Sequence, residues 1–147
     1  PKKIIDLLPN DTTFLVSKNN TYGRMNKGAG MLDSLKLNKE IITDYDLIFY
    51  YEPRLLLQST DFIDEFLSGK ENMFSFESDK RVKTGYFGSS SKDLNDFIDS
   101  YSVKEILNDN LHIELLMYQF YEQRNTRFEY TSTSLWKNYL SEIYEKY

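Results

Sequence analysis

The chain has 147 residues, of which 40% are hydrophobic and 28% are charged, as in an ordinary globular domain. This composition excludes a disordered tail and a collagen-like or coiled-coil rod. The net charge of −5 has the wrong sign for steering the whole chain toward nucleic acid or anionic lipid, so we expect no nucleic-acid partner.

The chain has no cysteine and a single histidine, His112. It therefore has no disulfide framework and no thiolate metal site, and a zinc site would take most of its ligands from carboxylates. No apolar run approaches the ~20 residues that a membrane-spanning helix needs, and the N-terminus shows no signal-peptide pattern. We therefore expect no transmembrane segment and a reducing, cytoplasmic location.

Strand-like runs rich in β-branched and aromatic residues alternate with amphipathic helical patterns. In chain order, the predicted elements are a strand at 12–16, a loop at 17–28, a helix at 28–42, a strand at 46–51, a helix at 60–67, strands at 72–76 and 84–88, a helix at 91–101, a helix at 109–123, a strand at 127–131 and a helix at 134–147. The alternation predicts an α/β fold: a single domain over 1–147, with a mixed sheet of about five short strands covered by helices.

The run at 46–51, DLIFYY, is almost continuously apolar. Such a run is typical of a strand at the centre of a sheet, buried on both faces. We expect the helices at 28–42 and 109–123 to pack on this sheet. Around the second helix, the residues expected to be buried are Leu116, Met117 and Phe120, and those expected to be in water are Glu122, Gln123 and Arg124.

The first candidate site is the glycine-bearing loop at 26–30, which leads into a predicted helix. Free backbone N–H groups at a helix N-terminus suit phosphate, and Lys27 and Arg24 add positive charge there. The loop matches neither a P-loop nor a dinucleotide-binding fingerprint. It is also typical of a glycine-assisted turn that binds nothing.

The second candidate site is Glu52 with Arg54, directly after the apolar strand. Ligands of open α/β sheets bind outside the carboxyl ends of strands, and Pro53 favours an extended conformation at Glu52. The alternative is an Arg–Glu ion pair on the surface at a strand end.

The third candidate site is His112 with Glu114, near the start of the helix predicted at 109–123. Residues two apart do not share a helical face, so the pair would act together only in the first turn. The alternative is that His112 caps the helix and Glu114 is solvated.

The stretch 26–57, NKGAGMLDSLKLNKEIITDYDLIFYYEPRLLL, resembles the middle of a GT-A type nucleotide-sugar glycosyltransferase of the bacterial surface-polysaccharide type. In that family an N-x-G segment leads into a helix, and a strand that begins Tyr-Asp ends in an acidic motif. Here the strand begins at Tyr45-Asp46 and ends at Glu52. The segments 84–90 and 112–116 resemble the later, acceptor-side parts of that family.

The resemblance implies a domain that binds a nucleotide sugar and transfers the sugar to a saccharide or lipid acceptor. In this role Glu114 is the expected catalytic base. The expected substrate-binding residues are Lys27, Arg24, Glu52, Arg54 and His112.

Two departures from the family pattern stand out. The D-x-D motif that holds a divalent metal in that family is missing from the strand end, since Asp44-Tyr45-Asp46 precedes the strand. We therefore assign no metal ligand, and Mn²⁺ or Mg²⁺ is the cofactor to test if the domain is active. Only 2–8 and 12–16 precede the glycine-bearing loop, so we expect a domain that lacks the first nucleotide-binding unit.

The alternative is a non-catalytic domain that binds a protein partner through a tyrosine-rich surface. The tyrosines expected on that surface are Tyr118, Tyr121, Tyr139, Tyr144 and Tyr147. A pocket that joins Glu52, Arg54 and Glu114 would favour the enzyme, whereas a flat tyrosine-rich face would favour the binding domain.

Overall fold

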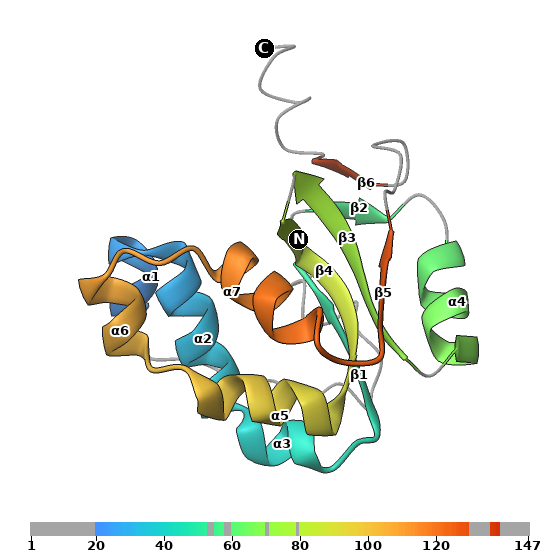
Figure 1. Ribbon diagram of the computed structural model, residues 1–147, viewed down its shortest axis with the longest axis horizontal. Helices are drawn as coiled ribbons and strands as arrows, with labels where there is room; N and C mark the ends of the chain where they lie inside the picture. The colour runs from blue at the N-terminus through green and yellow to red at the C-terminus, as the bar shows by residue number, and fades with distance from the viewer. Residues whose placement is uncertain are drawn as a thin grey trace, which may run out of the picture.

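The computed structural model describes residues 20–52, 55–57, 60–69, 71–78, 80–129 and 136–138. They form a mixed α/β fold in which helices cover a β-sheet, which confirms the predicted class at that level (Figure 1). The strand predicted at 12–16 lies outside these residues. Of the helix predicted at 134–147 only 136–138 is described, and it is a strand. In the described ranges no helix is long and apolar enough to span a membrane.

The main sheet has four described strands, in the order β1 (Leu47–Tyr51), β4 (Arg81–Ser90), β3 (Asn72–Ser78) and β5 (Thr126–Glu129). β4 runs antiparallel to β1 and β3, whereas β3 and β5 are parallel, so the sheet is mixed as predicted. A separate antiparallel pair is formed by β2 (Leu55–Leu57) and β6 (Trp136–Asn138).

β1 lies at the end of the described sheet, where it pairs with β4 alone, and all five of its residues are half-buried. The prediction of a central strand buried on both faces is therefore wrong for the described part. The apolar run has another cause, because hydrophobic clusters lie on both faces of the sheet. Leu47, Phe49 and Tyr51 pack against one cluster, and Ile48 and Tyr50 pack against the other.

The helices are α1 (Thr21–Met25), α2 (Lys27–Leu37), α3 (Lys39–Thr43), α4 (Asp61–Gly69), α5 (Ser91–Ser100), α6 (Val103–Asn108) and α7 (Ile113–Tyr121). Two helices are shorter than predicted. The helix expected at 28–42 is divided at Asn38, whose side-chain amide donates to the Ser34 carbonyl over 2.8 Å. The helix expected at 109–123 begins only at Ile113, because Asn110 adopts a left-handed backbone with φ 47°.

α4 covers one face of the sheet, and α5 and α7 cover the other (Figure 1). Phe62 and Phe66 of α4 pack on Met73 and Tyr86. Gly88 makes this packing possible, since a Cβ at that position would lie 2.4 Å from the Phe66 ring.

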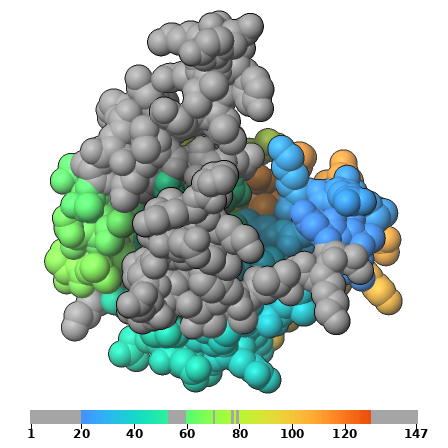
Figure 2. All heavy atoms as spheres, turned by 180° about the vertical axis from the view of Figure 1, so that it is seen from behind, coloured from blue at the N-terminus to red at the C-terminus, as the bar shows by residue number. Residues whose placement is uncertain are grey.

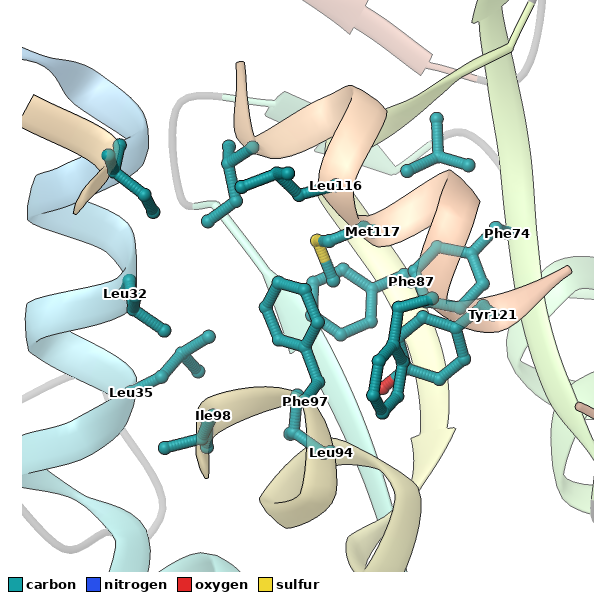
Figure 3. Packing of buried hydrophobic residues seen from close by; sticks show 14 of the residues in the cluster. Leu32, Leu35, Phe74, Phe87, Leu94, Phe97, Ile98, Leu116, Met117 and Tyr121 are labelled. Carbon is teal, nitrogen blue, oxygen red and sulfur yellow. The ribbon is translucent and has the colours of Figure 1, made fainter. Parts of the chain in front are cut away.

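The larger core lies between the sheet and the helices of the other face. Figure 3 shows its side chains from α5 and α7 facing Phe74 and Phe87 of the sheet, with Leu32 and Leu35 of α2 reaching toward Ile98. The expected packing on the sheet is confirmed for α7, whereas α2 packs mainly on α1 and α6 and less extensively on α3, α5 and α7.

A row of aromatic rings crosses the sheet on this face. Tyr50, Phe87, Phe74 and Phe128 are consecutive partners in the strand register of β1, β4, β3 and β5. Tyr50 stacks on Phe87 and Phe87 on Phe74, with ring centroids 5.0 and 5.1 Å apart. Such cross-strand pairs stabilise a sheet and here hold all four strands in register.

The end of α7 agrees with the sequence except at Arg124. Leu116, Met117 and Phe120 are buried and Glu122 and Gln123 are exposed, as expected.

Arg124 is half-buried, because its guanidinium lies 3.3 Å from the centre of the Phe120 ring and donates to the Phe120 carbonyl over 2.7 Å. It thereby satisfies a carbonyl near the C-terminal end of the helix, where a positive charge is favourable.

Candidate functional site

The N-termini of α2 and α7 meet, and Asn26 joins them. Its side-chain oxygen accepts a hydrogen bond from the Ala29 N–H at 3.1 Å, which caps α2. Its side-chain nitrogen donates to the Leu111 carbonyl at 3.4 Å and to Asn110 Oδ1 at 3.5 Å, in the turn before α7. One amide therefore caps one helix and contacts the segment that leads into the other.

Gly28 brings the same two helices into contact. It is buried, and a Cβ there would lie 2.9 Å from the Cβ of Ile113, so only glycine permits this approach. Lys27 directly precedes Gly28, and His112 and Glu114 flank Ile113. The contact therefore brings three of the predicted site residues to one corner of the molecule.

We call this region the α2–α7 corner and define it by Arg24, Lys27, His112 and Glu114. Arg24 belongs to the last turn of α1, whose C-cap is Asn26, so it lies next to the corner. Figure 2 shows α1 and the start of α2, in blue, at the surface on one side of the molecule.

The α2–α7 corner is suited to an anion. Arg24, Lys27 and His112 are exposed, and both helices direct N-terminal backbone N–H groups to this region. Unpaired N–H groups at a helix N-terminus carry partial positive charge and attract phosphate.

His112 and Glu114 occupy the start of α7. His112 is the N-cap residue, but its side chain makes no capping hydrogen bond, so the alternative of a capping histidine is wrong. Its carbonyl instead accepts from the N–H groups of Leu115 and Leu116, each at 3.1 Å. Glu114 is half-buried in the first turn, where the helix dipole stabilises a negative charge.

Glu52 lies at the end of β1 and is half-buried. Its N–H donates to the Gly85 carbonyl at 2.8 Å, which continues the pairing of β1 with β4. Arg54 lies outside the described residues. The convergence of Glu52, Arg54 and at least one of Lys27 and Glu114 on one cleft therefore remains a prediction.

The Asp44-Tyr45-Asp46 triplet lies before β1, as the sequence indicated. Asp44 is the C-cap of α3, and Asp46 precedes the first residue of the strand. Within the ranges that the structure describes, no three carboxylate or histidine side chains cluster as metal ligands. These residues therefore offer no preformed metal site.

A shallow hollow of about 290 Å³ lies at the start of β1 and α5. Its described lining consists of Thr43, Tyr45, Asp46, Ser90, Ser91, Lys92 and Asn95. Because β1 runs from Leu47 to Tyr51, this hollow lies at the opposite end of the strand from Glu52. Its lining includes none of the predicted site residues.

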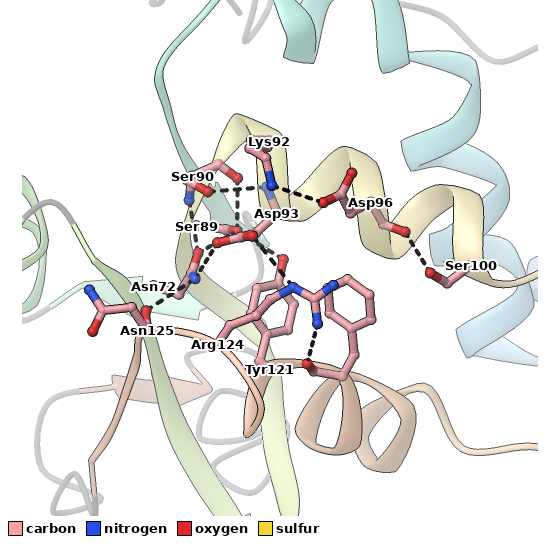
Figure 4. Close-up of polar contacts among 11 residues, drawn as sticks. Asn72, Ser89, Ser90, Lys92, Asp93, Asp96, Ser100, Tyr121, Arg124 and Asn125 are labelled. Carbon is pink, nitrogen blue, oxygen red and sulfur yellow. Dashed lines mark hydrogen bonds and ion pairs between the residues drawn. The ribbon is translucent and has the colours of Figure 1, made fainter.

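A buried polar cluster that the sequence did not predict lies between the sheet, α5 and α7 (Figure 4). Asn72 accepts from Ser89 Oγ and the Ser90 N–H, both at 2.9 Å, and donates to Asp93 at 2.7 Å. Ser89 Oγ is 2.8 Å from the Tyr121 hydroxyl. These groups satisfy one another, so the cluster attaches the two helices to the sheet.

Of the five tyrosines named for the tyrosine-rich surface, the structure describes Tyr118 and Tyr121, and neither is exposed. Tyr121 is fully buried, and burial raises the pKa of its phenol above the ordinary value. Tyr118 is half-buried against Phe76 and Phe128. The other three tyrosines of that prediction, Tyr139, Tyr144 and Tyr147, lie outside the described residues.

Comparisons of the chain with protein-family models, with curated proteins and with solved structures found no match. The resemblance to GT-A glycosyltransferases therefore rests on the sequence segments named above.

Proposed function

We propose that this chain is a glycosyltransferase-like domain that binds the diphosphate of a nucleotide sugar at the α2–α7 corner. The observation that carries the proposal is the contact of Asn26 and Gly28 with the start of α7, which joins two helix N-termini. A diphosphate is a strong hydrogen-bond acceptor with several negative charges. Two adjacent N-termini beside Lys27 and Arg24 provide both the donors and the positive charge that it requires.

The proposed transfer uses the residues of the corner in different roles. Lys27 and Arg24 stabilise the charge that develops on the diphosphate as it leaves the sugar. Glu114 accepts the proton of the acceptor hydroxyl while the hydroxyl oxygen bonds to the sugar carbon and the bond to the diphosphate breaks. The acceptor is a saccharide or a lipid.

The remaining predicted residues have binding roles. His112 donates a hydrogen bond to the diphosphate or the sugar, and Glu52 contacts the donor from the end of β1. Arg54 keeps the donor-binding role that the resemblance implies. A cytoplasmic location is part of the proposal, because a chain without cysteine fits a reducing compartment.

Calorimetry with UDP, GDP and CDP sugars, each with and without Mn²⁺ or Mg²⁺, tests this proposal. One of these donors is expected to bind, and Lys27→Ala should lower its affinity about tenfold, or about 1.4 kcal/mol. Lys92→Ala is the matched control, since Lys92 is an exposed lysine in the first turn of another helix, α5. Failure of all three donors to bind, or an equal loss in both variants, would contradict the proposal.

A further inference from the structure

We infer that Asn26 is a positioning residue, which holds the two helix N-termini of the α2–α7 corner together without contacting the ligand itself. The inference rests on the proposed function, which gives a diphosphate as the ligand of the corner. The positioning role of Asn26 is inferred from its hydrogen bonds.

The side chain of Asn26 is fully engaged within the protein. Its oxygen accepts from the Ala29 N–H, and its nitrogen donates to Asn110 and Leu111. An amide with both ends engaged in this way has little capacity left for a phosphate. Its two partners are 84 and 85 residues away in the sequence, so it joins separate parts of the chain.

The turn before α7, which the Asn26 side chain contacts, has a defined backbone conformation. Asn110 has a left-handed backbone, which asparagine adopts more readily than most residues. The Leu111 N–H donates to the Ile106 carbonyl at 3.0 Å, which ties this turn to α6. The turn is therefore held by α6 on one side, and Asn26 contacts it on the other.

The two contacts from the Asn26 nitrogen, at 3.4 and 3.5 Å, are longer than the roughly 2.7–3.2 Å of a typical N–H···O hydrogen bond, so they are weak. They therefore contribute little to the stability of the whole chain. Their effect is on orientation, because they set how Lys27, the next residue, faces the start of α7. Ligand affinity should respond to their loss more than stability does.

Asn26→Ser separates the two roles of this side chain. Serine retains the cap, as Ser90 and Ser102 show in this chain by accepting from the N–H three residues later, each at 3.1 Å. Serine has no amide to donate to Leu111. Asn20→Ser is the matched control, since Asn20 is exposed and caps α1 through the Gly23 N–H at 3.1 Å.

The three proteins are compared by amide hydrogen exchange and by calorimetric titration with UDP, GDP and CDP. In Asn26→Ser we expect several-fold faster exchange at 110–116, unchanged exchange in β3 and β4, and about tenfold weaker nucleotide binding. Asn20→Ser should match the wild type in both measurements.

Two results would overturn the inference. One is an Asn26→Ser variant that behaves like Asn20→Ser, and the other is faster exchange with unchanged nucleotide affinity. If the wild-type chain binds none of the three nucleotides, the proposed function fails, and the exchange at 110–116 alone decides whether Asn26 holds the corner.

Discussion

Glycines mark close approaches between elements of this chain, and two of these approaches position α4 and the candidate site. Gly88 lets α4 lie on the sheet through Phe66, and Gly28 lets α2 meet Ile113 at the α2–α7 corner. The sequence predicted that the glycine-bearing loop at 26–30 would present free N–H groups suited to phosphate. The structure shows that Gly28 has a packing role, since the atom nearest to its missing Cβ belongs to a neighbouring helix.

Gly88→Ala is expected to destabilise the protein by about 1–3 kcal/mol, the usual cost of overpacking a core. The reason is that the added Cβ would lie 2.4 Å from Phe66 Cδ2, which forces α4 or its phenylalanine to move. Urea unfolding measures the change. Gly69→Ala is the control, because its Cβ would lie 3.7 Å from the nearest atoms, which belong to the Glu71 side chain. This substitution should change the free energy of unfolding by less than about 0.5 kcal/mol. Equal stabilities for the two variants would show that α4 does not pack closely on β4.

At the scale of elements, α7 is the helix most firmly attached to the sheet. Its apolar residues form much of the larger core, the Tyr121 hydroxyl meets Ser89 of β4, and Arg124 pairs with Asp93 of α5 at 3.4 Å. These polar contacts lie at the C-terminal end of the helix. The N-terminal end is attached to α2, so α7 connects the sheet to the candidate site.

The buried Tyr121 makes stability depend on pH in the alkaline range. Burial raises the pKa of its phenol in the folded protein above 10.0, the value of a free tyrosine. Below about pH 10 both states hold the proton, and this residue adds no pH dependence. Above about pH 10 the tyrosine loses its proton in the unfolded state before it does so in the folded state, so the free energy of unfolding falls as pH rises. For one proton the fall is at most about 1.4 kcal/mol per pH unit.

Tyr121→Phe should remove this loss of stability at alkaline pH. Near pH 7 the variant should be about 1 kcal/mol less stable, because it lacks the hydrogen bond to Ser89. Above pH 10 its stability should fall less steeply than that of the wild type, as denaturant titrations at successive pH values would show. Tyr22→Phe, in the exposed α1, controls for the removal of a hydroxyl. Parallel pH curves for the wild type and Tyr121→Phe would rule out a buried, protonated Tyr121.

The sequence predicted the type of most described elements but not their exact ends. The strands at 46–51, 72–76, 84–88 and 127–131 all exist, because β-branched and aromatic runs are a local signal. The two long helices were predicted too long, since apolar spacing continues across Asn38 and Asn110 although the backbone turns there. The polar Asn72 and Ser89 within apolar strands were the available signal for the buried cluster.

At the scale of the whole molecule, the arrangement depends on contacts between distant residues, which local patterns do not encode. β1 was expected at the centre of the sheet, yet it lies at the end of the described strands. The sequence pointed to the residues of the α2–α7 corner one at a time and did not predict that they lie together. What brings Lys27 close to His112 and Glu114 is the pair of long-range contacts made by Asn26 and Gly28.

The central claim is that the α2–α7 corner binds the diphosphate of a nucleotide sugar. The most direct test is a two-dimensional ¹H–¹⁵N NMR titration of the whole chain with UDP, GDP and CDP. We predict that one of them shifts amide signals at 24–30 and 110–116, while those at 43–46 and 90–95, around the hollow, stay in place. Shifts confined to the hollow, or no shifts at millimolar nucleotide, would contradict the claim.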